Sequence, residues 1–248
     1  MSDPRKPIKD VSDASSIKML FDVATSDPSY DALSQIQFAP AHLGLKIAMA
    51  CMDGKVYVYE CMDVSVLSDW SLEESFDAFA LGHARNAGVR CLCWNPSKFD
   101  PPQLVCGGEG DENGSALVRV WQLSEATHKW SLVCELDKHI GCGVNGVAWA
   151  PNMGRSYHLI ASAGQDPSQQ LKVHRLARTP ERLVPAATQL LPNADQAQGI
   201  WRVGWNVTGT VLASSGEEGV VRLWKGSFRG DWTEVRAVAS SQFEPTPP

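Results

Sequence analysis

The sequence has no long run of apolar residues and no run of basic residues. No apolar stretch approaches the roughly 18 residues that cross a bilayer, and residues 1–16 lack the apolar core of a signal peptide. We therefore expect an intracellular protein without membrane insertion. The 28 acidic residues outnumber the 22 basic ones, giving a net charge of −6. Because phosphate binding needs clustered Lys and Arg, we expect no direct binding of nucleic acid.

Motifs for metal ions and disulfides are also missing. The sequence has seven cysteines, an odd number, and their spacing matches no disulfide framework. Most lie in or beside apolar runs. Such cysteines are typical of buried thiols in a reducing compartment. The six histidines are scattered, and His139 with Cys142 forms the only pair at zinc spacing, without a second pair to complete a site. The sequence predicts neither a metal site nor a cofactor.

Signatures of catalysis are equally scarce. No G-x-S-x-G elbow marks a nucleophile. The glycine-rich segment 107–114 lacks the Lys and Ser/Thr of a phosphate-binding loop, so we interpret it as a solvated hairpin. The adjacent carboxylates Glu73-Glu74 and Glu217-Glu218 diverge in a strand or turn and are interpreted as solvated charges. We predict no catalytic residues and no small-molecule substrate.

An internal repeat is the main positive feature of the sequence. Four segments, 34–40, 89–96, 144–151 and 201–209, each place one aromatic residue before a turn. These repeat anchors are spaced by 56, 55 and 56 residues, and they are Phe38, Trp94, Trp149 and Trp205. At fixed repeat positions, large aromatic residues usually serve core packing. Equal spacing predicts one structural unit used four times.

Each unit continues in the same order. A short apolar run, a turn such as Asp53-Gly54, Asp166-Pro167 or Glu218-Gly219, and a β-rich strand follow the anchor. The residues near the ends of these β-rich strands are Tyr59, Trp121, His174 and Trp224. Fourth strands are expected at 130–136, 187–191 and 232–238, with a weaker one near 74–81. A strand at 17–23 precedes the first unit.

Four-stranded units without helical periodicity predict an all-β fold, a β-propeller of the WD40 type. A β-sandwich is the rival, but its strands need not recur at a fixed interval. The period exceeds the 40–45 residues typical of WD40 repeats, the WD dipeptide is absent, and Gly-His occurs once, at Gly82-His83. Three further tryptophans flank or begin outer strands and are candidates for the surface: Trp70, Trp130 and Trp232. The inner strands begin with no shared ligand set, which argues against a propeller hydrolase.

Three stretches resemble a known family. The run 201–235, which includes WRVGWNVTGTVLASSGEEGVVRLWKG, resembles the last repeat of the Seh and Sec-thirteen class of WD40 proteins. The stretches 38–72 and 149–166 favour the Seh-type nucleoporin over its relative in vesicle coats. The resemblance extends from about residue 30 to residue 238 of this chain.

The resemblance implies a non-enzymatic scaffold whose incompletely closed, six-bladed propeller is completed by an α-solenoid nucleoporin. It implies a place in the outer-ring, Y-shaped complex of the nuclear pore at the nuclear envelope. Relatives also belong to the SEA or GATOR assembly, which regulates TOR signalling at the vacuolar or lysosomal membrane surface. A COPII-type vesicle-coat subunit and a generic WD40 adaptor are the alternatives, with a propeller hydrolase third.

The expected domain organisation has three parts. Residues 1–16 form a disordered N-terminal segment, 17–238 the propeller and 239–248 a disordered tail. Family members carry about two further repeats before the segment that matches residue 30, where this chain has a polar stretch. The four recognisable blades either close as a small ring or stay an open arc, and exposed strand edges in an open arc need a partner.

Overall fold

β-Strands make up all the described secondary structure apart from one short 3-10 helix, η2 (Ala41–Leu43). The computed structural model describes residues 32–65, 67, 69–79, 88–110, 115–140, 143–165, 171–179, 182–191 and 199–239. Within these ranges, no helix has the length and apolar character needed to cross a membrane. The predicted strand at 17–23, the segment 1–16, the pairs Gly82-His83 and Asp166-Pro167, and residues 240–248 lie outside the described part, so the domain boundaries stay a prediction.

The strands form four antiparallel sheets, each built from four strands that follow one another in the chain. We call these sheets blades 1 to 4 and the first strand of each its inner strand. Blade 1 contains β1 (Leu33–Phe38), β2 (Lys46–Cys51), β3 (Lys55–Cys61) and β4 (Trp70–Asp77). Blade 2 contains β5 (Val89–Trp94), β6 (Gln103–Gly110), β7 (Ser115–Ser124) and β8 (Lys129–Glu135). A short strand, β9 (His139–Ile140), pairs with β7.

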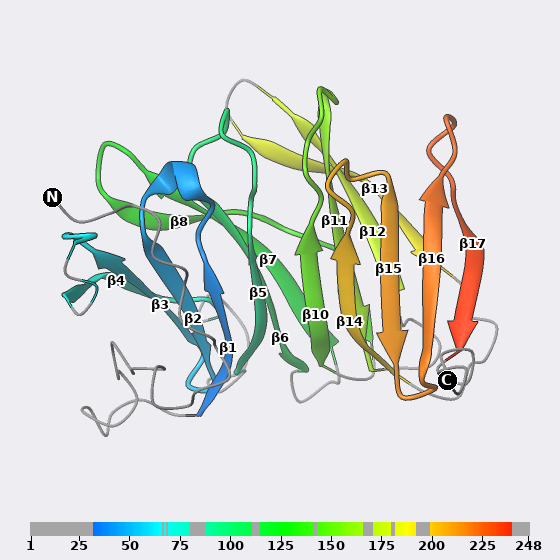
Figure 1. Ribbon diagram of the computed structural model, residues 1–248, viewed down its shortest axis with the longest axis horizontal. Coiled ribbons are helices and arrows are strands. Elements are labelled where there is room, and N and C mark those ends of the chain that lie inside the picture. Colours follow the sequence, from blue (N-terminus) through cyan, green and yellow to red (C-terminus); the bar gives the residue numbers. More distant parts are fainter. Residues whose placement is uncertain are drawn as a thin grey trace, which may run out of the picture.

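The other two blades repeat this pattern. Blade 3 contains β10 (Val144–Trp149), β11 (Tyr157–Gly164), β12 (Leu171–Arg178) and β13 (Leu183–Leu191). Blade 4 contains β14 (Ile200–Trp205), β15 (Val211–Gly216), β16 (Val220–Gly226) and β17 (Trp232–Ala239). Figure 1 shows the blades in chain order, from blade 1 in blue to blade 4 in orange and red. The predicted all-β fold of four four-stranded units is thus confirmed.

Tight turns within the blades form where the sequence predicts them. Gly54 and Gly219 adopt φ angles of 87° and 68°, a region that glycine occupies without steric cost. The turn before β3 is further held by Asp53, whose Oδ1 accepts a hydrogen bond of 2.8 Å from the backbone N–H of Lys55. These local interactions set the register of the β2–β3 and β15–β16 hairpins.

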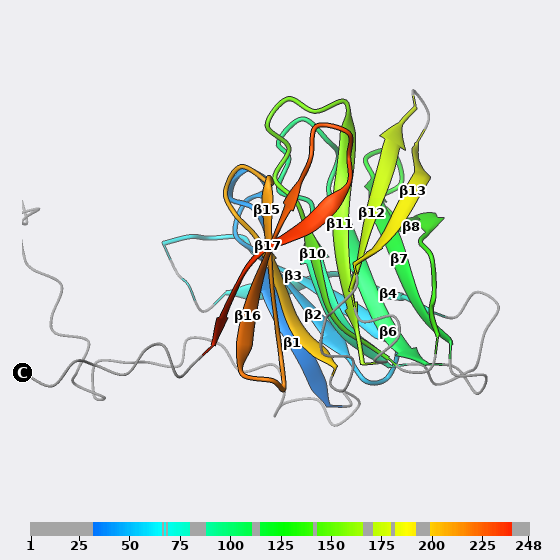
Figure 2. The same cartoon turned by 90° about the vertical axis from the view of Figure 1, so that its right-hand side faces the viewer.

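The apolar core is divided into layers between successive blades. One buried cluster joins blades 1 and 2, a second joins blades 2 and 3, and a third joins blades 3 and 4. Alternation along the inner strands explains this arrangement, since neighbouring residues point to opposite faces of a blade. In β5, Trp94 faces blade 1, whereas Cys91 and Cys93 both face blade 3, as expected for cysteines two apart in a strand. Figure 2 shows the blades from the side of blade 4.

Two expectations from the sequence are wrong. Trp130 and Trp232 do not lie at the surface but are buried, because each packs on aromatic residues within the layer between blades. The glycine-rich segment is not a solvated hairpin throughout: Gly107 and Gly108 are buried within β6. A Cβ at Gly107 would lie 2.6 Å from Cys91 Sγ, so glycine is required there by close packing.

Candidate interaction surface

The aromatic anchors of blades 2 to 4 all point back to the preceding blade. Trp94 Nε1 donates a hydrogen bond of 3.3 Å to the backbone oxygen of Gln37, and Trp205 Nε1 donates one of 3.0 Å to that of Ala148. Trp149 is buried in the cluster that joins blades 2 and 3, although its Nε1 donates within its own blade to His158 Nδ1 at 3.4 Å. The repeated aromatic position is therefore a contact between blades.

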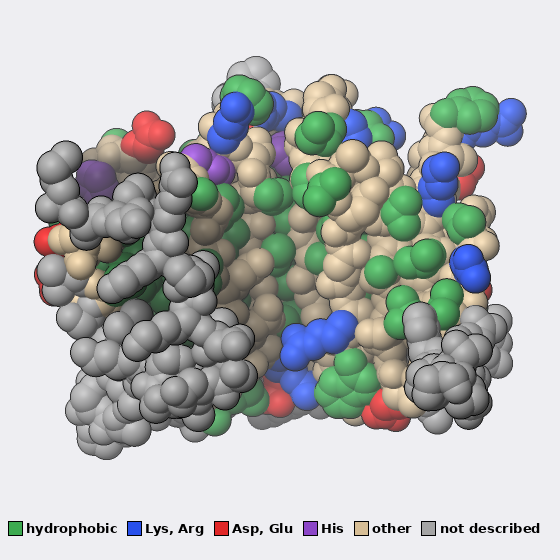
Figure 3. Space-filling view, in the orientation of Figure 1, with side chains coloured by type: hydrophobic (Ala, Val, Ile, Leu, Met, Phe, Trp, Pro, Cys, Tyr) green, Lys and Arg blue, Asp and Glu red, His purple; other side chains and the backbone are tan. Residues whose placement is uncertain are grey.

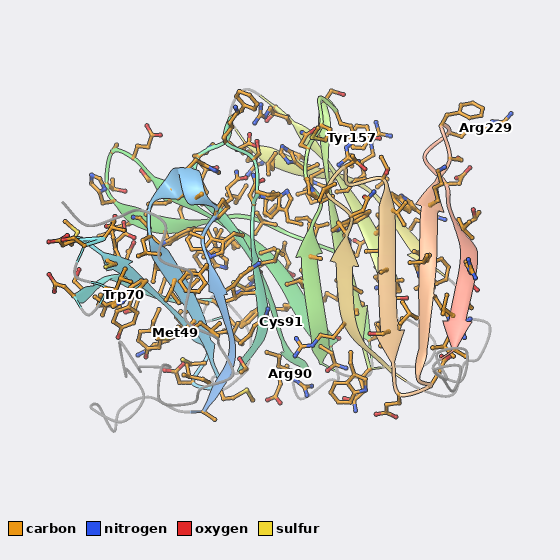
Figure 4. The ribbon with its side chains drawn as sticks, in the orientation of Figure 1. Met49, Trp70, Arg90, Cys91, Tyr157 and Arg229 are labelled. Atoms are coloured by element: carbon orange, nitrogen blue, oxygen red, sulfur yellow. The ribbon has the colours of Figure 1, made fainter. Side chains whose placement is uncertain are left out.

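Phe38 occupies the same position in blade 1, where no preceding blade is present among the described residues. Its side chain is 62% exposed, and Ile36 on the same face is 59% exposed. Met49 and Tyr57 lie further across this face in a small buried cluster, and Figure 4 labels Met49 and Trp70 in this blade. Only the inner strand of this face is thus exposed, at Ile36 and Phe38, whereas the counterparts of Phe38 in blades 2 and 3 are covered.

On the other side of blade 4, no described atom covers the inner strand at Gly204. A Cβ at Gly146 of blade 3 would lie 3.1 Å from the backbone oxygen of Trp201, because blade 4 packs closely there. In contrast, Gly204 lies in the inner strand of blade 4, and a Cβ added to it would meet no described atom within 4 Å. The inner strand of blade 4 therefore has room for a further strand to approach it.

The predicted strand-end residues lie in the blade interior. Tyr59, Trp121, His174 and Trp224 are all buried. In blade 4, Trp224 Nε1 donates a hydrogen bond of 2.9 Å to Ser214 Oγ. In blade 3 the equivalent hydrogen bond joins His174 Nε2 and Ser162 Oγ at 2.8 Å. Ser162 Oγ also lies 2.7 Å from His139 Nε2. These hydrogen bonds satisfy polar atoms inside an apolar blade.

Blade 2 breaks this pattern. Cys106 stands where blades 3 and 4 have Ser162 and Ser214, as the strand pairing shows. Trp121 Nε1 is consequently buried without a hydrogen-bond partner. A buried unpaired donor costs about 1–3 kcal/mol, which a serine hydroxyl at this position would recover in part.

We expect Cys106→Ser to raise the free energy of unfolding by about 1 kcal/mol. The gain should appear in urea titrations followed by circular dichroism. In a Trp121→Phe background, which removes the indole donor, the same substitution should give no gain. Equal effects in both backgrounds would mean that the new hydroxyl does not pair with the indole.

The described residues offer little for catalysis. They contain no group of three or more His, Cys, Asp or Glu side chains placed to hold a metal ion. Burial raises the pKa of Cys91 and of Cys134 to about 12, so both thiols stay protonated and are poor nucleophiles. Burial lowers the pKa of His158, and the nearby positive charge of Arg155 lowers it further. His158 Nε2 lies 3.7 Å from the buried carboxylate of Asp100, which also pairs with Arg178 and so links the β5–β6 loop to blade 3.

A repeated β-bulge is a feature that sequence analysis missed. The pairing register shifts at the same place in each inner strand. The four residues at these bulges are Ser34, Arg90, Asn145 and Trp201, and all line one cavity of about 320 Å³. None of its described lining residues carries a carboxylate, and the four side chains at the bulges differ in chemistry.

Comparison with known proteins agrees with this geometry. Residues 190–225 match the WD40 family, described as WD domain, G-beta repeat. The chain is 34% identical over 211 residues to nucleoporin SEH1 of Danio rerio, and 33% identical over 214 residues to nucleoporin SEH1 of Homo sapiens. Nucleoporin SEH1-B of Xenopus laevis is 33% identical over 214 residues.

These alignments cover 82% of this chain and 56% of each relative, so the chain spans little more than half the length of the curated relatives it matches. The repeat spacing, the four four-stranded blades and the similarity along most of the chain all agree. The chain is a homologue of the SEH1 nucleoporins and carries a WD40 repeat.

Proposed function

We propose that this protein is a non-enzymatic scaffold subunit of the outer-ring, Y-shaped complex of the nuclear pore, where it supports transport of protein and mRNA. The similarity to nucleoporins named SEH1 supports this proposal. The resemblance described above adds a second proposed role, as a subunit of the SEA or GATOR complex that regulates TOR signalling at the vacuolar or lysosomal membrane surface.

The exposed inner strand of blade 1 is the observation that carries the proposal. Phe38 is exposed at a repeat position where Trp94 and Trp149 are buried against a neighbouring blade. Exposed apolar residues on the face of a sheet are a liability unless something covers them. We propose that an α-solenoid nucleoporin completes the propeller by packing a strand or sheet on this face.

Affinity purification of the tagged protein from its own cells, followed by mass spectrometry, tests the proposal. Recovery of outer-ring nucleoporins would support it, and SEA or GATOR subunits beside them would support the second role. Recovery of vesicle-coat subunits alone would favour the COPII-type alternative. If neither set is recovered, the scaffold proposal fails and only the fold remains.

Phe38→Asp should reduce recovery of the solenoid partner by about tenfold or more, because a charge would replace an aromatic residue at the centre of the contact. The fold should survive, since Phe38 is exposed in the free chain. Phe99→Asp is the matched control: Phe99 is also exposed but belongs to the β5–β6 loop. Equal recovery by the two variants would exclude the Phe38 face as the contact.

A further inference from the structure

A basic cleft lies between blades 3 and 4, at the end of the molecule that carries the β10–β11, β14–β15 and β16–β17 loops. Its volume is about 500 Å³. Arg155, Arg175 and Arg229 line it, against one acidic residue, Asp231. Figure 3 shows basic side chains in blue at this end, and Figure 4 labels Tyr157 and Arg229 there. Three arginines in one cleft stand out in a chain of net charge −6.

Arg175 is held in place by stacking. Its guanidinium lies 4.0 Å from the ring centroid of Tyr157, a cation–π contact that fixes the side chain on the wall of the cleft. Stacking uses the face of the guanidinium and leaves its N–H groups, which lie in its plane, available to an anion. Among the described residues, no hydrogen bond or ion pair is found for this guanidinium. Arg175 is therefore a pre-positioned anion-binding group.

Arg155 closes one end of the cleft and joins the two blades. It donates hydrogen bonds of 2.6 Å to the backbone oxygen of Gly209 and 2.7 Å to that of Pro151, while its Nε is buried without a partner. Gly209 has a φ of 63°, and a Cβ there would lie 2.4 Å from the Pro151 oxygen. This close approach keeps the β10–β11 and β14–β15 loops together, so the cleft is a formed structure.

The loops around the cleft carry exposed apolar side chains. Phe228, in the β16–β17 loop beside Arg229, is 97% exposed, Val207 is 85% exposed and Met153 is 70% exposed. None of the three lines the cleft itself, but each lies in a loop that also supplies a lining residue, so this end of the molecule matches a ligand that has both acidic and apolar groups. Its open shape fits an extended chain better than a small enclosed molecule.

We infer that this cleft binds an acidic peptide segment of a partner protein, with carboxylates paired to Arg175 and Arg229 and an apolar residue packed beside Phe228 and Val207. The arginines supply paired N–H donors that match carboxylate geometry. This surface lies on blades 3 and 4, away from the Phe38 face of blade 1, so the inference does not depend on the proposed function.

Fluorescence anisotropy with the full chain tests the inference. The probe is a short labelled peptide in which Glu and Asp residues flank a central Leu-Phe pair, compared with the same peptide carrying Gln and Asn. We expect the acidic peptide to bind and the amide peptide to bind much more weakly. Arg175→Gln and Arg229→Gln should each weaken binding about three- to tenfold. Arg236→Gln, which changes an exposed arginine outside the cleft, should have no effect.

Several results would overturn the inference. They are absence of binding by the acidic peptide, equal binding of the two peptides, and an equal loss in the Arg236→Gln variant. Displacement of the peptide by inorganic phosphate at constant ionic strength would indicate a site for small anions instead. Tighter binding of a single-stranded oligonucleotide would indicate a nucleic-acid surface. Phe38→Asp leaves this cleft unchanged, so that variant should still bind the acidic peptide. The two proposals can therefore fail separately: loss of the solenoid partner concerns the scaffold proposal, and loss of peptide binding concerns this inference.

Discussion

Trp94→Ala is expected to lower the free energy of unfolding by about 3–5 kcal/mol, the usual cost of removing a large buried aromatic side chain. That is a large share of the roughly 5–15 kcal/mol by which folded domains are stable. Trp94 packs edge-on against Trp130 at 5.9 Å, and Trp130 stacks on Phe76 of blade 1 at 5.3 Å. The substitution would open a cavity in this layer and remove the hydrogen bond to Gln37. Urea titration followed by far-ultraviolet circular dichroism measures the loss.

Phe38→Ala is the matched control, since it changes the same repeat position in blade 1. Because Phe38 is exposed, its loss should cost less than about 1 kcal/mol in the free chain. The difference between the two variants measures what a preceding blade contributes at this position. Similar costs for both would contradict the assignment of the aromatic anchor to the contact between blades.

The number and order of the strands could be predicted because each repeat is marked by residues that are close together in the sequence. An aromatic anchor, an apolar run and a turn each act over a few residues, so their recurrence marks each blade. For example, the Asp53-Gly54 turn marks the β2–β3 hairpin, and Gly54 adopts the positive φ that such turns need. The weak fourth strand expected near 74–81 lies at Trp70–Asp77, since outer strands have less apolar alternation to mark their ends.

The burial of tryptophans outside the repeat anchors could not be predicted, since it depends on the neighbouring blade. Trp232 begins an outer strand, a position that usually meets solvent. Its ring nevertheless contacts Trp205 of the inner strand at 5.1 Å, and its backbone N–H donates to Gln189 of blade 3. The alternation of apolar and polar residues along a strand cannot predict this burial, because the contacts join residues up to 43 positions apart.

The candidate binding surfaces show the same limit. Arg155, Arg175 and Arg229 are far apart in the sequence, and no basic run marks them. They meet because blade 3 supplies two and the β16–β17 loop of blade 4 supplies the third. In contrast, one of the two alternatives left open by the sequence, an open arc of four blades, predicts uncovered strands at its ends, and Phe38 is indeed exposed.

The strand-end position is a tryptophan in blade 4 but a histidine in blade 3, and the histidine makes stability depend on pH. Blade 4 has Trp224 at this position, which donates to Ser214 and carries no titratable group. Blade 3 has His174 in the same place, bonded to Ser162 and lying 3.1 Å from Thr188 Oγ1 through Nδ1. Burial and then the neighbouring His139 lower the pKa of His174 to about 3, while Asp137 opposes this and Lys172 adds to it.

We expect the protein to lose stability as the pH falls below about 6.5, the pKa of histidine in an unfolded chain. The unfolded chain then takes up a proton that His174 in the folded chain cannot bind, so the stabilisation present above pH 6.5 is lost progressively toward pH 3. His174 should contribute about 1 kcal/mol for each pH unit between pH 6.5 and 5, where few carboxylates titrate. Urea titrations at a series of pH values measure this slope.

His174→Trp should reduce the slope, because the indole Nε1 can donate to Ser162 as Trp224 does to Ser214 and cannot take up a proton. Should the larger ring lower stability overall, the change of stability with pH still reports the loss of the histidine. His42→Gln, which replaces an exposed histidine outside this network, should leave the slope unchanged. An unchanged slope in His174→Trp would show that His174 is not the group that makes the fold sensitive to acid.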